Sequence, residues 1–183
     1  MKNLDVIALG ELLIDFTENG FSANGNPLLE ANPGGAPCNV LAMLQNLGKK
    51  TAFIGKVGKD AFGDYLKDTV CQAGIDVTNL IQDAAVPTTL AFVHTAADGD
   101  RSFSFYRDPG ADMMLSESEI DYNQITDAKI FHFGTLSMTH DGVRAATIKA
   151  VDYAKEHGLL ISFDPNYRPF LWKKEETAKE MMR

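Results

Sequence analysis

Apolar positions between residues 36 and 48 recur at helical spacing. Four of them fall at positions i, i+3, i+4 and i+7, which places them on one helix face: Val40, Met43, Leu44 and Leu47. Pro37 fits the first turn of such a helix, where its missing N–H costs no hydrogen bond. The pattern therefore predicts a helix that begins near Pro37 and ends before Gly48, a stop signal.

Two adjacent glycines, Gly34 and Gly35, lie directly before this predicted helix. They place no side chains near the free backbone N–H groups of the helix N-terminus, where ligands can bind. They also suit a tight turn that requires a positive φ angle. The stretch alone leaves both interpretations open.

The segments on either side alternate between strand and helix patterns. VIALGELLIDF, at 6–16, predicts a strand, a tight glycine and a second extended piece that ends near Asp15. TAFIGKVG, at 51–58, is rich in β-branched and aromatic residues and predicts another strand. A helix follows, with Asp60 as its N-cap and Gly74 as its end. One face of that helix holds Phe62, Leu66, Val70 and Ala73.

Residues 88–107 interrupt this alternation. Two β-rich runs flank Asp98-Gly99, a dipeptide that strongly favours a hairpin turn. The alternation then resumes with a strand at KIFHFG, a helix over 141–157 and a buried strand at LLISF, while the final KKEETAKEMMR predicts a helix with a solvated charged face. Alternating elements with continuous apolar strands predict an α/β fold with a mostly parallel sheet.

Composition excludes several classes of partner. The 183 residues are 45% hydrophobic, which suits one globular domain with a sizeable core. A net charge of −8 disfavours binding to nucleic acid or to anionic lipid. The chain shows no apolar run long enough for a membrane span and no signal-peptide pattern, so a cytoplasmic location is expected.

The cysteines and histidines do not form a recognisable site in the sequence. Cys38 and Cys71 lack C-x-x-C spacing and are expected to be reduced packing residues. A first-turn position can lower the pKa of a thiol such as Cys38, but no partner histidine is indicated. The four histidines lack metal-ligand spacing, and His132 is expected to be a strand residue with a satisfied hydrogen bond. No metal ligands are assigned.

Candidate binding residues gather where strands are expected to end. In an open parallel sheet, ligands bind outside the carboxyl ends of the strands. Asp15 ends one predicted strand, and the turn DPNYR after another carries Asn166 and Arg168. An amide suits hydroxyl groups and a guanidinium suits phosphate. Singly, each residue could equally be a turn former, a cap or a surface ion pair.

Five segments together resemble a known family: GELLIDF, NPGGAPCNVLAML, GKVGKDAFG, FYRDPGAD and FDPNYRPFLW. In this order they look like the amino-terminal half of sugar kinases of the ribokinase (PfkB) family, and most closely like its bacterial fructokinases. The resemblance implies a ribokinase-like three-layer α/β/α sandwich with a mostly parallel sheet and a small β lid. Residues 1–183 would be an amino-terminal portion of that domain, with lid segments at about 11–33 and 86–112.

The resemblance also implies roles for individual residues. Asp15 and Asn39 would bind sugar hydroxyls, while Gly34 and Gly35 would form a hinge that brings backbone against the sugar. Arg107 would face the sugar from a lid strand. Phe103 and Phe105 share its strand face and would either line the sugar or pack the lid. In the following segment, Asn166 would help organise the Mg-nucleotide region and Arg168 would lie near the transferred phosphate.

The family's catalytic base belongs to a G-A-G-D motif that is absent from this sequence, as is the N-x-x-E magnesium motif, so no catalytic residue is assigned within 1–183. The expected function of the full-length protein is phosphorylation of a sugar, fructose in the first instance, with ATP and Mg²⁺ and as a homodimer formed through the lid. The 183-residue chain alone is expected to be inactive. The alternatives are a 2-keto-3-deoxygluconate kinase and a non-catalytic sugar-binding or interaction module.

Overall fold

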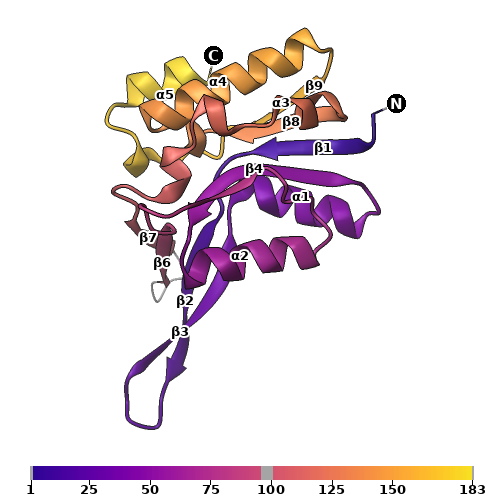
Figure 1. Ribbon diagram of the computed structural model, residues 1–183. Helices are drawn as coiled ribbons and strands as arrows, with labels where there is room; N and C mark the ends of the chain where they lie inside the picture. Colours follow the sequence, from indigo (N-terminus) through magenta and orange to yellow (C-terminus); the bar gives the residue numbers. More distant parts are fainter. Residues whose placement is uncertain (1, 96–100, 183) are drawn as a thin grey trace.

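A five-stranded parallel sheet forms the centre of the molecule (Figure 1). The computed structural model describes residues 2–95 and 101–182. The strand order is β5-β4-β1-β8-β9. The strands are β1 (Leu4–Leu9), β4 (Thr51–Gly58), β5 (Leu80–Asp83), β8 (Ala128–Gly134) and β9 (Leu160–Asp164). The expected α/β fold with a mostly parallel sheet is thus confirmed.

Helices cover both faces of this sheet. The helices are α1 (Ala36–Asn46), α2 (Ala61–Gln72), α3 (Tyr122–Thr126), α4 (Asp141–Glu156) and α5 (Glu175–Met181). Val6 and Ala8 of β1 pack in one core cluster with residues of α1 and α2, whereas Ile7 and Leu9 pack in another with residues of α3 and α4. Because successive strand residues point to opposite faces, β1 supplies both cores, and the layers are helix, sheet and helix.

A second, four-stranded sheet projects from this body (Figure 1). Its strands are β2 (Leu13–Phe21), β3 (Pro27–Gly34), β6 (Leu90–Thr95) and β7 (Arg101–Tyr106), in the order β3-β2-β6-β7. β2 and β6 are parallel, and the two outer pairs are antiparallel. The predicted hairpin is therefore β6–β7. The expected turn at Asp98-Gly99 lies outside the described residues.

The predicted ends of the helices agree with the structure. The Asp60 side chain accepts a hydrogen bond of 2.8 Å from the Gly63 N–H at the start of α2. Gly48, Gly74 and Gly158 follow α1, α2 and α4 with φ angles of +74°, +86° and +69°. Glycine adopts this left-handed conformation without a Cβ penalty, which is why it ends helices.

Three expectations about burial and strand ends are corrected. β2 continues past Asp15 to Phe21 because it pairs with β3 on one side and β6 on the other. Within the described residues β9 lies at the edge of the sheet, and Leu160 is 70% exposed there rather than buried. The predicted apolar face of α1 points largely outward: Met43 and Leu47 are 58% and 61% exposed, and the helix instead buries Pro37, Cys38 and Leu41. None of the helices in the described ranges is long and apolar enough to cross a membrane.

Candidate functional site

A cavity of about 480 Å³ lies where the two sheets meet. The small sheet, the start of α1 and the segments after β8 and β9 all contribute to its walls. The lining residues are Glu11, Leu13, Asp15, Thr17, Asn32, Gly35, Ala36, Asn39, Val93, Phe103, Phe105, Leu136, Asn166 and Arg168. We call this the inter-sheet cavity. It brings together seven of the nine candidate binding residues named from the sequence, and an eighth, Gly34, lies against Asp15.

Asp15 reaches the inter-sheet cavity from the middle of β2. Leu13, Asp15 and Thr17 alternate along the strand, so their side chains share the face that lines the cavity. Burial raises the pKa of the Asp15 carboxyl, and the positive charge of Arg168 acts in the opposite direction. Asp15 lies in the small sheet and Arg168 in the segment after β9, yet the charge of Arg168 acts on the Asp15 carboxyl.

The two positions before α1 require glycine for different structural reasons. Gly34 pairs with Leu13 across the β2–β3 ladder, and a Cβ at this position would overlap the Asp15 carboxylate. Gly35 is the N-cap of α1 with a φ of +129°, and a Cβ there would collide with the Glu11 carbonyl oxygen. The positive φ of Gly35 confirms the tight-turn interpretation of this stretch. Gly35 also lines the cavity, and ligand binding at this helix N-terminus stays a prediction.

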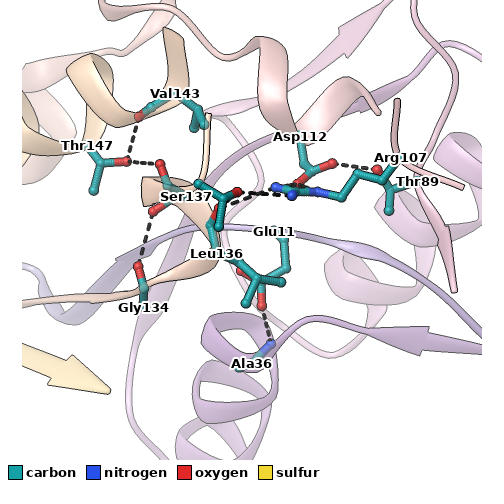
Figure 2. Close-up of polar contacts among 11 residues, drawn as sticks. Glu11, Ala36, Thr89, Arg107, Asp112, Gly134, Leu136, Ser137, Val143 and Thr147 are labelled. Carbon is teal, nitrogen blue, oxygen red and sulfur yellow. Dashed lines mark hydrogen bonds and ion pairs between the residues drawn. The ribbon is translucent and has the colours of Figure 1, made fainter. Parts of the chain in front are cut away.

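The N-terminus of α1 forms another wall of the cavity. Asn39 lies one turn into the helix, is exposed and lines the cavity. The Ala36 N–H donates a hydrogen bond of 2.8 Å to Oε1 of Glu11 (Figure 2). Glu11 is only 3% exposed, and this burial raises the pKa of its carboxyl to about 7. Sequence reasoning missed Glu11. The available signal was spacing: Glu11 lies two residues before Leu13 and four before Asp15, which is the two-residue period of one strand face.

Asn166 and Arg168 line the cavity from the segment after β9. Asn166 has a φ of +36°, which is unusual for a residue with a side chain, and its N–H donates to Oδ1 of Asp164 at 3.0 Å. The Thr135 hydroxyl donates to the Pro165 carbonyl, so the loop after β8 fixes this turn. The amide and the guanidinium are thus presented from one constrained turn.

Aromatic residues of β7 complete the wall on the small sheet. Phe103 and Phe105 both line the cavity, with ring centroids 6.1 Å apart. Phe105 also packs against Phe170, with centroids 5.8 Å apart. The sequence left open whether these rings line the cavity or pack the small sheet, and the structure places them at the cavity surface.

Arg107 does not lie in the cavity lining, which corrects its expected position. Its Nη2 is 2.6 Å from Oδ2 of Asp112, and the two side chains are 4% and 2% exposed. The guanidinium also donates to the Leu136 carbonyl at 3.3 Å and to the Thr139 hydroxyl at 3.1 Å (Figure 2). Strand alternation would place Arg107 on the same face as Phe105, two residues earlier. Because β7 ends at Tyr106, this alternation does not extend to Arg107. Arg107 supports the wall residue Leu136 from behind.

Other polar residues have structural roles. Nδ1 of His132 lies 3.0 Å from the Ser162 hydroxyl, which confirms the expected strand histidine with a hydrogen bond. Cys38 is buried, and burial raises the pKa of its thiol to about 12, opposite to the lowering that a first-turn position can cause. Within 2–95 and 101–182, no three His, Cys, Asp or Glu side chains form a group that could hold a metal ion.

Comparison with known proteins assigns the chain to a family. Residues 3–183 match the family described as pfkB family carbohydrate kinase, and the chain belongs to this family. Fructokinase-2 of Solanum lycopersicum is 43% identical over 180 residues, covering 97% of this chain and 55% of that relative. The chain therefore spans about half the length of the curated relative.

Solved structures of relatives agree with the fold. A crystal structure of fructokinase from Xylella fastidiosa has a TM-score of 0.91 and 33% sequence identity, covering 100% of this chain and 57% of that one. The structure of the same enzyme with bound ATP has a TM-score of 0.89 and 33% identity, covering 100% and 56%. The ribokinase-like fold inferred from the sequence motifs is thus confirmed.

Proposed function

We propose that this chain is the sugar-binding part of an ATP-dependent sugar kinase, and that the full-length protein transfers the γ-phosphoryl group of ATP to a hydroxyl of fructose. One observation carries the proposal. The inter-sheet cavity places a carboxylate, Asp15, an amide, Asn39, and a guanidinium, Arg168, on three separate elements around one space. This set combines acceptors and donors for hydroxyl groups with a cation for a phosphate.

The sugar would occupy the part of the cavity near β2 and α1. The carboxylate of Asp15 accepts hydrogen bonds from hydroxyl groups, and the amide of Asn39 both donates and accepts them. The rings of Phe103 and Phe105 offer an apolar surface to the C–H groups of the sugar. A volume of about 480 Å³ lies in the range typical of small-molecule sites.

The phosphate would approach from the segment after β9. Arg168 supplies positive charge where charge develops on the transferred phosphoryl group, and Asn166 lies beside it as a neutral donor. The Xylella fastidiosa fructokinase described with bound ATP supports ATP as the phosphoryl donor. We propose that Mg²⁺ arrives with the phosphates of ATP, whose oxygen atoms are the ligands that this ion prefers.

The small sheet is proposed to act as a lid over the sugar. It contributes Asp15, Phe103 and Phe105 to the cavity, while Arg168 comes from the segment after β9. A movement of the small sheet toward the central sheet would narrow the cavity and exclude water during transfer. We propose Gly34 and Gly35 as its hinge and the small sheet as a contact between two subunits.

Fructose is proposed over the sugar acid 2-keto-3-deoxygluconate. The sugar side of the cavity carries the carboxyl groups of Asp15 and Glu11, and the carboxylate of the sugar acid would be repelled by their negative charge. A neutral ketohexose meets no such repulsion. Because the G-A-G-D motif expected to hold the base is absent from the sequence, residues 1–183 alone are proposed to be inactive.

A coupled assay of ADP release tests the proposal with the full-length protein and MgATP. We expect a kcat/KM for fructose at least about tenfold above those for ribose and 2-keto-3-deoxygluconate, since sites built on hydrogen bonds reject mismatched analogues strongly. A preference for the sugar acid would contradict the proposed substrate. Fructose binding without any ADP release would favour a non-catalytic sugar-binding module.

A further inference from the structure

Glu11 is a buried carboxyl group at the junction of β2 and α1 in the inter-sheet cavity. It precedes β2, its Oε1 accepts from the first N–H of α1, and it lines the same space as Asp15 and Asn39. The Gly35 carbonyl then accepts from the Asn39 N–H at 2.9 Å within the first helical turn. One carboxyl therefore connects the chain entering β2 to the turn that carries Asn39.

We propose that Glu11 is a positioning residue for the sugar, which holds the start of α1 so that Asn39 faces Asp15, and that its ionised form does this best. The proposal rests on the proposed function for its ligand. An ionised carboxylate makes a shorter and stronger hydrogen bond to a backbone N–H than a neutral acid does. It also interacts favourably with the positive end of the α1 dipole.

The surroundings of Glu11 bring it into the range where its charge changes near neutral pH. Burial is the main cause that raises the pKa of Glu11 to about 7, and the Asp112 charge adds to it, while Arg107 and the Ala36 N–H oppose it. Cys38 of α1 stays neutral, because burial and the Glu11 charge raise its pKa to about 12. Asp15 and Arg168 are the remaining charged residues of the cavity lining.

Ionisation of Glu11 should improve the positioning of Asn39 but lower the stability of the fold. The pKa of this carboxyl is higher in the folded chain than the ordinary value of 4.5. Its contribution to stability is thus complete below pH 4.5 and is lost as pH rises through about 7, where the buried group ionises. The stability that Glu11 contributes is therefore expected to fall over the same pH range in which its positioning of Asn39 is proposed to improve. A purely structural role would change stability alone.

The test compares Glu11→Gln with the wild type and with Glu30→Gln, an exposed carboxylate of β3, in the full-length protein. Glutamine keeps an acceptor for the Ala36 N–H but cannot ionise. We expect the wild-type KM for fructose to fall about three- to tenfold from pH 6 to pH 8, as the protonated fraction drops from about nine-tenths to one-tenth. In Glu11→Gln the KM should stay near the wild-type value at pH 6, whereas its denaturation midpoint at pH 8 should rise.

Amide hydrogen exchange at Ala36 gives a readout that does not depend on turnover. After correction for intrinsic rates, wild-type protection should increase through pH 7, and Glu11→Gln should show no such change. An identical pH dependence in both proteins, in KM or in exchange, would overturn the inference. A wild type that does not phosphorylate fructose would refute the proposed function, and the exchange experiment would still decide the role of Glu11.

Discussion

Arg107 and Asp112 form an ion pair with 2.6 Å between Nη2 and Oδ2, and both side chains are almost completely buried. The pair lies behind the cavity wall, and its guanidinium reaches the wall through the Leu136 carbonyl. Thr89 donates its hydroxyl to the other oxygen of Asp112, so the residue before β6, the residue after β7 and the loop after β8 meet at this pair. Arg107 is therefore first a structural residue of the inter-sheet junction.

Replacing Arg107 by alanine should destabilise the fold by about 3–5 kcal/mol, because it leaves the Asp112 charge buried and unpaired. Chemical denaturation of the 183-residue chain measures the loss. The double variant Arg107→Met/Asp112→Leu should recover much of it, since a buried pair can be replaced by apolar residues. A denaturation midpoint of Arg107→Ala equal to that of the wild type would show that the ion pair contributes no such stability.

The contact between Gly34 and Asp15 leads to a second prediction. Gly34→Ala should displace the Asp15 carboxylate, because the new Cβ would overlap it, and should raise the KM for fructose in the full-length protein. Gly142→Ala is the matched control, since the nearest atom to a Cβ there is 3.7 Å away and the site lies in the first turn of α4. Equal KM values for the two variants would exclude Gly34 from the geometry of the site.

Much of the site could be inferred from the sequence because its residues follow simple rules. The turn DPNYR indicated that Asn166 and Arg168 project from one rigid segment after a strand, and the structure shows them lining one cavity. The prediction for Asp15 rests on a strand end that the structure does not have. Asp15 lies within a strand rather than at its end, but its alternation with Leu13 and Thr17 still directs it to the cavity.

Other features could not be inferred because they depend on tertiary contacts. The spacing of Glu11 from Leu13 indicates the face that it shares with Asp15, but its burial and its hydrogen bond to the Ala36 N–H arise only when β2 and α1 come together. The helical spacing of Val40, Met43, Leu44 and Leu47 predicts an apolar face of α1, but the helix carries apolar residues on more than one side: Leu41 is fully buried while Met43 is exposed. Periodicity identifies a helix face but does not state which sheet, if any, covers it.

The central claim is that the inter-sheet cavity binds sugar through Asp15, and the kcat/KM for fructose of Asp15→Ala in the full-length protein tests it most directly. Loss of a charged acceptor should cost about 1.5–3 kcal/mol, or roughly 10- to 150-fold in kcat/KM. Stability should not fall, since burial raises the pKa of Asp15 and its ionised form does not favour folding. Glu18→Gln, an exposed carboxylate on the same strand, is the control and should match the wild type. A folded Asp15→Ala protein with wild-type kcat/KM for fructose would contradict the account.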